Sequence, residues 1–387
     1  MEIGYWIIVV IIIYAYLGYP IVLYMLSILF NYKKINSGNA INKWPGVDLL
    51  IAAYNEEKVI HSKIENSINL DYPSDKFNIW IASDGSSDRT NEIVRKYEAT
   101  NKNVHLLEFK RTGKSGVINR SMNILNAEIV VFSDANTEYS KDVIKKLIRH
   151  FQDPNIGCVS GRLKYRNPGK TMSGIGESVY WRYETALKKL ESKIGFVAGA
   201  NGAVYAIRKN LFEPLHKNTI NDDFTESMTI VKKGYMSIYE EKAMVFEDVA
   251  PSMQSEFKRH IRDGAGHYIA IIHLLGLLNP FLGMKSFIYY SHRIFRWMVP
   301  FLLIFIFIIN ILLLNNFIYQ ALFIFQCIFY MSAFIGWIGN NYKKMPFIIY
   351  IPFYFCNLNL ALFLGFIKAV TNKQKPTWER TERNSLL

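Results

Sequence analysis

The 387-residue chain concentrates its apolar residues in four long runs, one near its start and three near its end. The runs cover residues 5–30, 297–314, 317–338 and 347–367. A helix needs about 20 mainly apolar residues to cross a bilayer, so each run is a candidate span. A signal peptide is the alternative for the first run, but no basic residue precedes it and no small-residue cleavage site follows. We therefore expect an integral membrane protein that retains its first helix over residues 1–31.

The net charge of +13 has three candidate explanations: nucleic acid, anionic lipid or an anionic substrate. No nucleic-acid motif accompanies the basic residues, which are scattered or lie beside the apolar runs. Lipid headgroups and a phosphorylated substrate explain the charge better, and we expect no nucleic acid. The three cysteines, Cys158, Cys327 and Cys356, lack metal-ligand spacing and exclude a disulfide framework. This usage fits a domain that faces a reducing cytosol.

Strands alternate with helices between the first apolar run and residue 151. Buried strands are expected at residues 47–53, 78–82, 104–108 and 128–132, with helical periodicity after each one. Such alternation predicts a doubly wound α/β domain with a parallel sheet, whose loops gather at the carboxyl ends of the strands. That edge is where such folds bind ligands.

The pattern changes after Gly157. A long helix is expected at residues 176–190 and a strand at residues 202–207. A helix at residues 226–233 then follows a loop that carries two acids, and a strand is expected at residues 237–239. Residues 268–290 are apolar but interrupted by glycine and proline, which predicts interfacial helices rather than a clean span. The dipeptide Arg296-Trp297 is expected to anchor the next helix at the membrane surface.

Carboxylates occupy three loops of this framework. An Asp-Gly-Ser-Ser-Asp turn at residues 84–88 and an Asp-Ala-Asn turn at residues 134–136 each end a strand, and Asp222-Asp223 lies at or just before a helix start. A helix dipole keeps a carboxylate at that position ionised, as a general base must be. A helix N-cap is the structural alternative for the Asp pair, and a turn residue for Asp84. Three acidic loops on one framework favour a catalytic interpretation.

The ordered motifs at residues 52–57, 83–88, 133–136 and 221–223 resemble those of family 2 glycosyltransferases. The resemblance is to the membrane-embedded branch, which includes cellulose, chitin, hyaluronan and poly-N-acetylglucosamine synthases. It implies a GT-A fold, a doubly wound nucleotide-diphospho-sugar transferase domain inserted between transmembrane helices. It also implies an inverting transfer from a UDP-sugar in a multi-pass cell-membrane protein with a cytosolic catalytic domain.

The resemblance carries roles for individual residues. Asp223 matches the catalytic base, Asp222 replaces the preceding Glu of the motif, and Arg262 matches the arginine of an interface helix. Asp134 and Asn136 fall on the metal motif, where the amide can still coordinate Mg²⁺ or Mn²⁺ through its carbonyl. The residues assigned to the donor are Ala53, Tyr54, Glu56, Asp84, Lys114, Asp134 and Arg259. Lys114 also ends a Gly-Lys-Ser sequence, but Glu108 breaks the P-loop spacing and excludes a P-loop triphosphatase.

The interface helix departs from the family pattern. Processive members carry Gln-x-x-Arg-Trp, whereas this chain has Arg259 in place of Gln and Asp263 in place of Trp. The expected acceptor is a growing polysaccharide or other glycan, and the alternative is a single transfer to a polyprenyl-phosphate or other lipid. A basic helix that touches anionic lipids is the other interpretation of Arg262. A further alternative is a protein that only binds a nucleotide sugar. Expected partners are membrane lipids, the donor, the acceptor and polysaccharide-export proteins.

The expected domains are a GT-A domain at residues 45–255, interface helices at 256–292, membrane helices at 293–370 and a polar tail at 371–387. One span before a cytosolic domain and three after it would leave the tail outside. Yet Lys343, Lys344 and the basic tail are typical of the cytosolic side. Either one C-terminal run does not span, or residues 268–290 form a re-entrant element. The sequence leaves both open.

Overall fold

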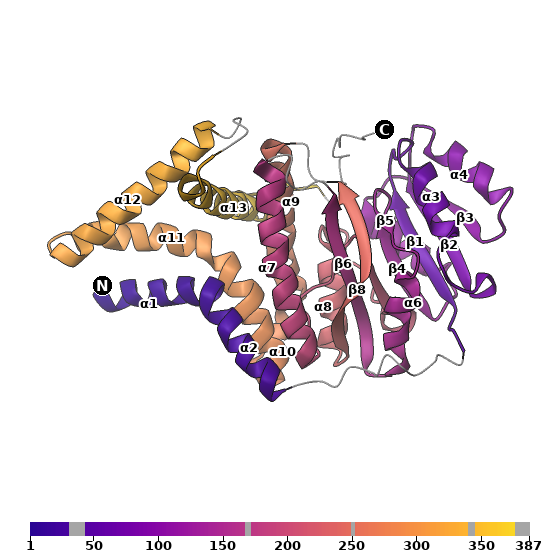
Figure 1. Cartoon of the computed structure of the whole chain (residues 1–387), viewed down its shortest axis with the longest axis horizontal. Coiled ribbons are helices and arrows are strands. Elements are labelled where there is room, and N and C mark those ends of the chain that lie inside the picture. The colour runs from indigo at the N-terminus through magenta and orange to yellow at the C-terminus, as the bar shows by residue number, and fades with distance from the viewer. Residues whose placement is uncertain (31–42, 167–171, 249–251, 340–344, 376–387) are drawn as a thin grey trace.

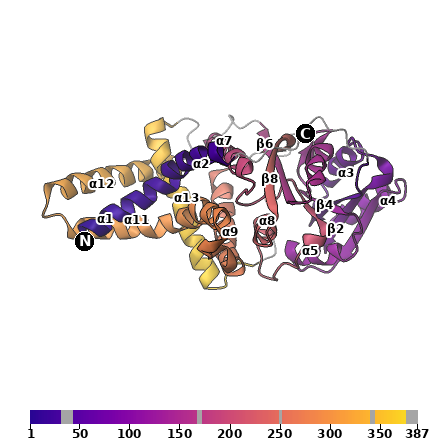
Figure 2. The ribbon, with the colours of Figure 1, turned by 90° about the horizontal axis from the view of Figure 1, so that it is seen from below.

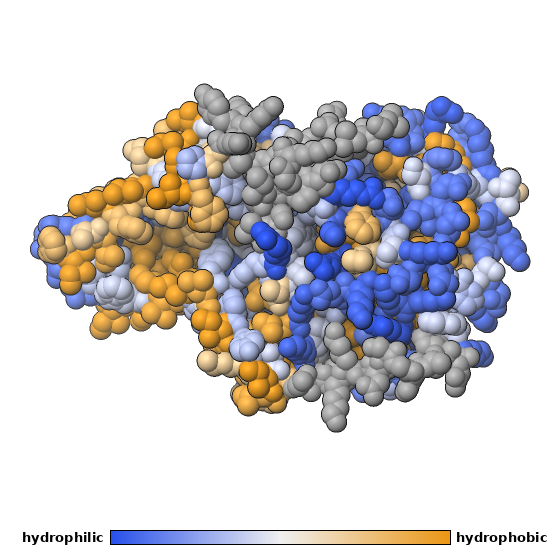
Figure 3. All heavy atoms as spheres, viewed as in Figure 1, coloured by the Kyte–Doolittle hydropathy of each residue, from blue (hydrophilic) through white to orange (hydrophobic). Residues whose placement is uncertain are grey.

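A computed structural model describes residues 1–30, 43–166, 172–248, 252–339 and 345–375, with side chains of the long helix α7 described from Tyr180. The polar middle of the chain forms an α/β domain, and apolar helices project from one side of it (Figure 1). Figure 3 shows the same division on the surface, with hydrophobic residues over the projecting helices and hydrophilic residues over the sheet domain.

An eight-stranded mixed sheet forms the centre of the domain. Its spatial order is β3-β2-β1-β4-β7-β6-β8-β5, and β1 to β4 pair in parallel. The strands are β1 (Val47–Ala53), β2 (Phe77–Asp84), β3 (Val104–Phe109), β4 (Ile129–Asp134), β5 (Glu138–Tyr139), β6 (Ile156–Arg166), β7 (Tyr205–Arg208) and β8 (Met236–Asp248). β7 runs antiparallel to β4 and β6, and β5 runs antiparallel to β8. β6 pairs in parallel with β8. The α/β class is confirmed, and the expected parallel direction holds for every strand but β7 and β5.

Helices cover both faces of the sheet. Apolar residues of α3, α4 and α6 pack on one face, and those of α5 and α8 on the other. The helices of the domain are α3 (Ile60–Ile68), α4 (Thr90–Glu98), α5 (Lys114–Met122), α6 (Val143–Ile148), α7 (Met172–Ile194), α8 (Asp222–Lys232) and α9 (Met253–His273). Because both faces are covered, β1 is buried along its whole length, and its sequence is an almost unbroken apolar run.

Four helical segments of the described chain are long and apolar enough to cross a membrane. They are Glu2–Leu29, Met284–Leu312, Phe317–Ile338 and Phe347–Val370. The first comprises α1 (Glu2–Ile13) and α2 (Tyr19–Leu29), and the second α10 (Met284–Tyr289) and α11 (Phe295–Leu312); the others are α12 (Phe317–Ile338) and α13 (Phe347–Val370). One π-helical turn, Tyr14–Gly18, joins α1 to α2, and another, Tyr290–Ile294, joins α10 to α11.

The apolar stretch at residues 268–290 is interrupted, as expected. α9 ends at His273, 3₁₀ turns follow at Leu275–Leu278 and Pro280–Leu282, and α10 begins at Met284, where a membrane-span candidate also begins. Its place at the membrane interface remains a prediction.

The expectation for the dipeptide Arg296-Trp297 is wrong. Arg296 and Trp297 are buried at 8% and 4% exposure rather than anchored at the membrane surface. Arg296 pairs with the buried Glu184 of α7, and Trp297 packs in an apolar cluster with Phe224.

Candidate active site

Three carboxylates converge on one ammonium group at the carboxyl edge of the parallel strands. Lys114, the first residue of α5, lies 3.0 Å from Asp134 Oδ1 and 3.2 Å from Asp222 Oδ2. Burial lowers the pKa of Lys114, but Asp134, Asp222 and Asp223 outweigh it and raise the pKa overall. The lysine therefore stays charged at any physiological pH.

Asp223 is adjacent to this cluster and is half-buried in the first turn of α8. A Cβ atom at Gly202 would lie 3.3 Å from Asp223 Oδ2 and 3.8 Å from Asp134 Oδ2, so both acids face the same small space. Burial raises the pKa of Asp223 to about 6, the Asp222 carboxylate adds to the rise, and Lys114 opposes it. A carboxylate with a pKa near 6 is a stronger base than an exposed aspartate yet is mostly ionised at pH 7.

Asp84 organises the loop before Lys114. Its carboxylate is fully buried and accepts hydrogen bonds from the backbone N–H groups of Thr112, at 2.6 Å, and Gly113, at 2.9 Å. Gly113 adopts φ +88°, a conformation that side chains disfavour, and the next residue begins α5. Asp84 thus positions Lys114 through the backbone, and direct contact with a donor remains a prediction.

The loop after β1 forms the neighbouring wall. Ala53 is buried at the end of the strand, and the Arg111 guanidinium lies over the Tyr54 ring, 3.1 Å from its centroid. The backbone N–H of Glu56 donates to Thr90 Oγ1 at 2.8 Å, which fastens this loop to the loop after β2. An aromatic ring capped by a cation offers a flat surface of the kind that stacks on a nucleobase.

Asn136 is oriented by a buried acid that the sequence did not single out. Its Nδ2 atom donates to Glu247 Oε1 at 3.1 Å, and Glu247, on β8, is 7% exposed. Because the amide nitrogen must face the carboxylate, the carbonyl oxygen is the atom that Asn136 can offer to a cation.

The donor set fits a hard divalent cation that is shared with a diphosphate. The oxygens of Asp134, Asp222 and Asp223 suit Mg²⁺ or Mn²⁺, and Asp222 Oδ2 is buried with an ion pair to Lys114 but no aligned hydrogen bond. Within the described residues, no group of three or more His, Cys, Asp or Glu side chains is arranged to hold a metal alone. Mg²⁺ is commonly bound by one or two carboxylates plus substrate phosphates, which is what this geometry allows.

Helix α9 packs against the start of α8. Asn221, which precedes the two acids, donates through Nδ2 to the Asp263 carbonyl at 2.9 Å. Arg262 pairs with its neighbour Asp263 at 3.3 Å, and Arg259 lies one turn earlier on the same helix. The structure therefore brings the α9 backbone to the acids, while the expected contact of Arg262 and Arg259 with a donor remains a prediction.

Glu226 is a buried acid that sequence reasoning missed. It is 2% exposed, accepts a hydrogen bond from Tyr205 Oη at 2.8 Å through Oε2, and has no partner for Oε1. Burial raises the pKa of Glu226 to about 8, with Asp222 and Asp223 adding to the rise. Its spacing of three residues from Asp223 on a helix was the available signal, since such residues share a face.

A buried ionic network, also missed, connects the membrane helices to the site. Arg293 donates through Nε to the Ala198 carbonyl at 2.8 Å, and Glu191 Oε2 accepts from the Ala198 N–H at 3.0 Å. Further along this loop, the Ala200 N–H donates to Ser227 Oγ, which itself donates to the Asp223 carbonyl at 2.7 Å. The members of the network are Glu184, Glu191, His292, Arg293 and Arg296.

Comparison with known proteins agrees with this geometry. Residues 48–212 match the family described as Glycosyl transferase family 2. A poly-β-1,6-N-acetyl-D-glucosamine synthase of Staphylococcus aureus (strain COL) is 25% identical over 236 residues, which cover 60% of this chain and 57% of that protein. A β-monoglucosyldiacylglycerol synthase of Trichormus variabilis is 26% identical over 199 residues, which cover 50% of this chain and 42% of that protein. The chain thus spans about half the length of the curated relatives that it matches.

A solved structure resembles nearly the whole chain. The mannosyltransferase PcManGT from Pyrobaculum calidifontis, in complex with GDP-Man and Mn²⁺, superposes with a TM-score of 0.69 at 19% identity. The match covers 96% of this chain and 99% of that one, and it shows the fold. Residues 48–212 thus match glycosyl transferase family 2, the sheet domain has the GT-A fold, and four helices beside it are long and apolar enough to cross a membrane.

Proposed function

We propose that this protein moves a sugar from a UDP-sugar to a growing polysaccharide or other glycan acceptor at the membrane, with inversion at the anomeric carbon. The observation that carries the proposal is the convergence of Asp134, Asp222 and Asp223 on Lys114. This arrangement combines a base, an ammonium group and cation-binding oxygens in one space, as a direct displacement requires.

Asp223 is the proposed base. It accepts the proton of the acceptor hydroxyl while that oxygen attacks the anomeric carbon, and the bond from that carbon to the diphosphate oxygen breaks. UDP departs with the bonding electron pair, and Lys114 stabilises the charge that develops on it. One displacement inverts the anomeric carbon and needs no covalent intermediate on the protein.

Asp134 and Asn136 are the proposed protein ligands of Mg²⁺ or Mn²⁺. The ion would neutralise the diphosphate and make it a better leaving group. The amide at position 136 removes one negative charge from the usual pair of acids, so we expect weaker metal binding than two carboxylates would give. The Glu247 hydrogen bond supports this role because it leaves the carbonyl oxygen to the cation.

Metal dependence gives the first prediction. EDTA should abolish transfer and weaken UDP binding, and Asp134→Ala should weaken Mn²⁺-dependent UDP binding about tenfold or more. Isothermal titration with UDP, with and without Mn²⁺, measures both effects. The exposed Asp75 provides a matched control as Asp75→Ala. An enzyme that retains full activity in EDTA would remove the metal from this proposal.

The proposed donor pocket comprises Ala53, Tyr54, Glu56, Asp84 and Lys114, with Asp134 at its diphosphate end. Arg262 and Arg259 of α9 are proposed to meet the diphosphate when donor is bound. Arg262→Ala should slow transfer at saturating donor if it does so, whereas unchanged kinetics would leave the helix with lipid contact alone.

A single transfer to a polyprenyl-phosphate or other lipid is the second candidate. Asp263 occupies the position where processive relatives carry a sugar-stacking tryptophan, and this observation favours the lipid acceptor. The two relatives support different acceptors: the polysaccharide synthase supports a glycan and the glycolipid synthase supports a lipid, at about the same identity. The proposed location is the cell membrane with the domain in the cytosol, where nucleotide sugars are made.

One experiment separates these functions. Purified protein in lipid nanodiscs is incubated with radiolabelled UDP-sugars, with GDP-mannose included, and Mn²⁺; products are resolved by size and by solvent partition. A long water-soluble polymer would support the polysaccharide synthase, and one sugar in the organic phase would support the lipid acceptor. Asp223→Asn should lower kcat by roughly 10²–10⁴-fold and retain UDP binding. No transfer from any donor, or near-normal turnover of Asp223→Asn, would contradict the proposal.

A further inference from the structure

Helix α13 contacts each of the other three membrane helices, and three of its ring contacts lie at one level. Its Phe355 lies 5.5 Å from Tyr16 and 5.9 Å from Phe329, measured between ring centroids, and its Phe366 lies 4.9 Å from Phe301. Tyr16, Phe329 and Phe301 each lie about a dozen residues from the helix end that points away from the sheet domain, which is roughly 18 Å of helix. Phe355 and Phe366 are 11 residues apart on α13, so a helix that ran alongside α1 and α11 would contact them at different depths. The contact with α12 is longer and extends to Gly336, where a Cβ would lie 2.5 Å from Phe353 Cβ.

Helix α13 also runs beside α9. Tyr354 Oη donates to Glu256 at 3.0 Å near one end of the contact, and the rings of Phe366 and Tyr268 lie 5.2 Å apart near the other. Between these pairs, a Cβ at Gly365 would lie 2.7 to 2.8 Å from backbone atoms of α9. The two helices therefore run side by side and parallel along this contact.

The shared course of the two helices constrains the depth of α13. The stretch of α9 that lies beside it carries many charges, at Glu256, Lys258, Arg259, Arg262 and Asp263. A charged side chain at the bilayer centre is energetically costly, and the cost rises with each further charge. If α13 crossed the membrane, α9 would follow it into the hydrocarbon core with these charges. Moreover, α9 contacts Asn221 at the aqueous site through the Asp263 carbonyl.

We infer that α13 does not cross the membrane but lies across the other helices in the leaflet next to the sheet domain. Its exposed apolar residues, which include Ile348 at 79% and Val370 at 65%, then contact the lipid of that leaflet. The chain crosses the membrane three times, through the helices Glu2–Leu29, Met284–Leu312 and Phe317–Ile338. Both ends of α13 remain on the side of the sheet domain.

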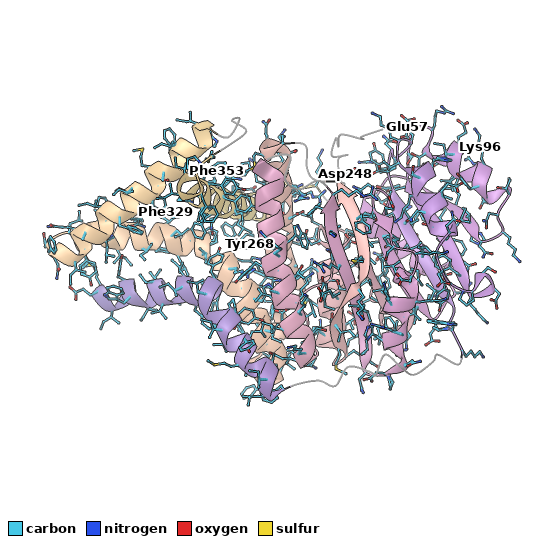
Figure 4. The ribbon with its side chains drawn as sticks, in the orientation of Figure 1. Glu57, Lys96, Asp248, Tyr268, Phe329 and Phe353 are labelled. Atoms are coloured by element: carbon cyan, nitrogen blue, oxygen red, sulfur yellow. The ribbon has the colours of Figure 1, made fainter. Side chains whose placement is uncertain are left out.

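The positions of the helices agree in both ribbon views. α1 and α11 run lengthwise away from the domain, whereas α13 is foreshortened in Figure 1 and runs across them in Figure 2. Figure 4 places Phe329 and Phe353 among the apolar helices and Tyr268 between them and the sheet domain, whose surface carries Glu57, Lys96 and Asp248.

The basic residues at the end of the sequence support three crossings. Lys343 and Lys344 lie between α12 and α13, and Lys373, Lys375 and the Arg-bearing tail follow α13. With four crossings these two basic segments would lie on opposite sides of the membrane. With three, both lie on the side of the domain, as the positive-inside rule requires for a cytosolic domain.

Cysteine accessibility tests the inference. In a Cys327→Ser, Cys356→Ser background, single cysteines replace the exposed residues Lys102 in the domain, Asn315 between α11 and α12, and Lys373 after α13; the buried Cys158 stays. An impermeant maleimide is applied to intact cells and to inverted vesicles. We expect Lys373→Cys to label with Lys102→Cys and opposite to Asn315→Cys. Labelling of Lys373→Cys together with Asn315→Cys would overturn the inference.

Depth measurement provides an independent check. Spin labels at Ile348, Leu360 and Ile367 of α13 should all report depths within one leaflet, as judged by oxygen and nickel-chelate accessibility. Labels at Phe317, Ile328 and Ile338 of α12 should progress from one membrane surface to the other. If the α13 labels progress in the same way, α13 is a span. Neither experiment depends on the proposed enzymatic activity, so the two conclusions can fail separately.

Discussion

At the residue scale, the environment of Asp223 determines the pH at which a base is available. Asp222 and burial raise its pKa to about 6, while Lys114 limits the rise. The fraction of Asp223 that is ionised therefore increases with pH through about 6 and is nearly complete above about 7. A charged neighbour, rather than exposure to water, keeps this half-buried carboxylate usable.

This environment predicts the pH profile of the enzyme. The value of kcat/KM at limiting donor should rise between pH 5 and 7, with a midpoint near 6, because only the ionised Asp223 accepts the acceptor proton. Initial rates across this range measure it. Lys114→Gln, which removes the opposing ammonium, should move the midpoint to higher pH. A profile that is flat from pH 5 to 8 would contradict the assignment of the base.

Glu226 predicts a pH dependence of stability. Burial raises its pKa from the ordinary value of 4.5 to about 8, so between these values the folded protein holds a proton that the unfolded chain has lost. The contribution of this protonated carboxyl to the free energy of unfolding is fully present below pH 4.5. It is lost as the pH rises through 8, and the loss amounts to roughly a few kcal/mol. Glu226→Gln should remove this decline and stabilise the protein at pH 9, with little change at pH 5.

Thermal unfolding in detergent at pH 5, 7 and 9 checks the prediction. Glu128→Gln is the control, because the Glu128 side chain is 62% exposed. An equal fall in melting temperature with pH for wild type and Glu226→Gln would show that Glu226 is not the titrating group.

At the scale of elements, the ionic network makes the membrane helices part of the site. The two π-helical turns meet, since Tyr14 Oη and Ser291 Oγ lie 2.9 Å apart, and the second turn directs His292 and Arg293 into the protein. π-Helical turns are often found at functional positions because they alter which side chains share a face. Here the second turn places the Arg293 guanidinium against the Ala198 carbonyl, in the loop whose Ala200 is linked to Asp223 through Ser227.

Arg293 and Arg296 should therefore differ in function although both pair with Glu184. Only Arg293 contacts the Ala198 carbonyl, whereas Arg296 reaches toward the Ala15 carbonyl of the first π-helical turn. Arg293→Gln should lower kcat roughly ten- to a hundredfold, because small displacements of a reacting group are costly, and should leave UDP affinity unchanged. Amide exchange over residues 198–202 should accelerate in that variant.

Arg296→Gln is the matched control, since it loses the same acid partner but no contact with the loop. It should lower the melting temperature and leave the exchange of residues 198–202 near wild type. If the activity of both variants falls only as much as their amount of folded protein falls, Arg293 contributes to stability alone. Arg293→Lys retains the charge and should recover part of kcat.

The sequence predicted those elements whose burial follows a local pattern of apolar residues. It failed for those whose position depends on contacts with residues far away in the chain. The strand expected at residues 47–53 is β1, because a strand covered on both faces reads as one apolar run. β5, with two residues, is too short to show periodicity and was missed, whereas the strand expected at residues 202–207 is β7, whose antiparallel direction no local pattern could give. Helix α8 begins at Asp222 rather than 226, because polar first-turn residues hide a helix start.

The same distinction applies to the site. The acidic loops, Lys114 and Asn136 could be selected from the sequence because they follow strands or begin helices, and the carboxyl ends of parallel strands meet at one edge. Glu247 and Arg293 could not, because their partners lie about 95 to 110 residues away in the sequence. Glu226 had only its helical spacing from Asp223 as a signal. Arg296-Trp297 looked like an interface anchor because Glu184, its partner on α7, is invisible from local context.

At the scale of the whole molecule, the contact between α9 and α13 connects the membrane to the reaction site. Gly264 and Gly365 let the two backbones approach, and α9 then presents the Asp263 carbonyl to Asn221 at the start of α8. Two helices, α13 and α9, therefore separate the lipid from the acids of the site. The soluble domain is thereby held at a set distance from the leaflet where an acceptor would emerge.

A change at Gly365 tests this connection. A Cβ there would lie 2.7 Å from Ala265 N, 2.8 Å from the Gly264 carbonyl carbon and 2.8 Å from Ile261 O, all backbone atoms that cannot rotate away. Gly365→Val must therefore push α13 from α9, and we expect kcat to fall about tenfold or more in the monodisperse, folded fraction. Gly4→Val is the control, because nothing lies within 4 Å of a Cβ at that membrane-helix glycine. Nanodisc assays of both variants compare transfer at equal folded protein. Wild-type kcat in Gly365→Val would show that the sheet domain works independently of how α13 lies in the membrane.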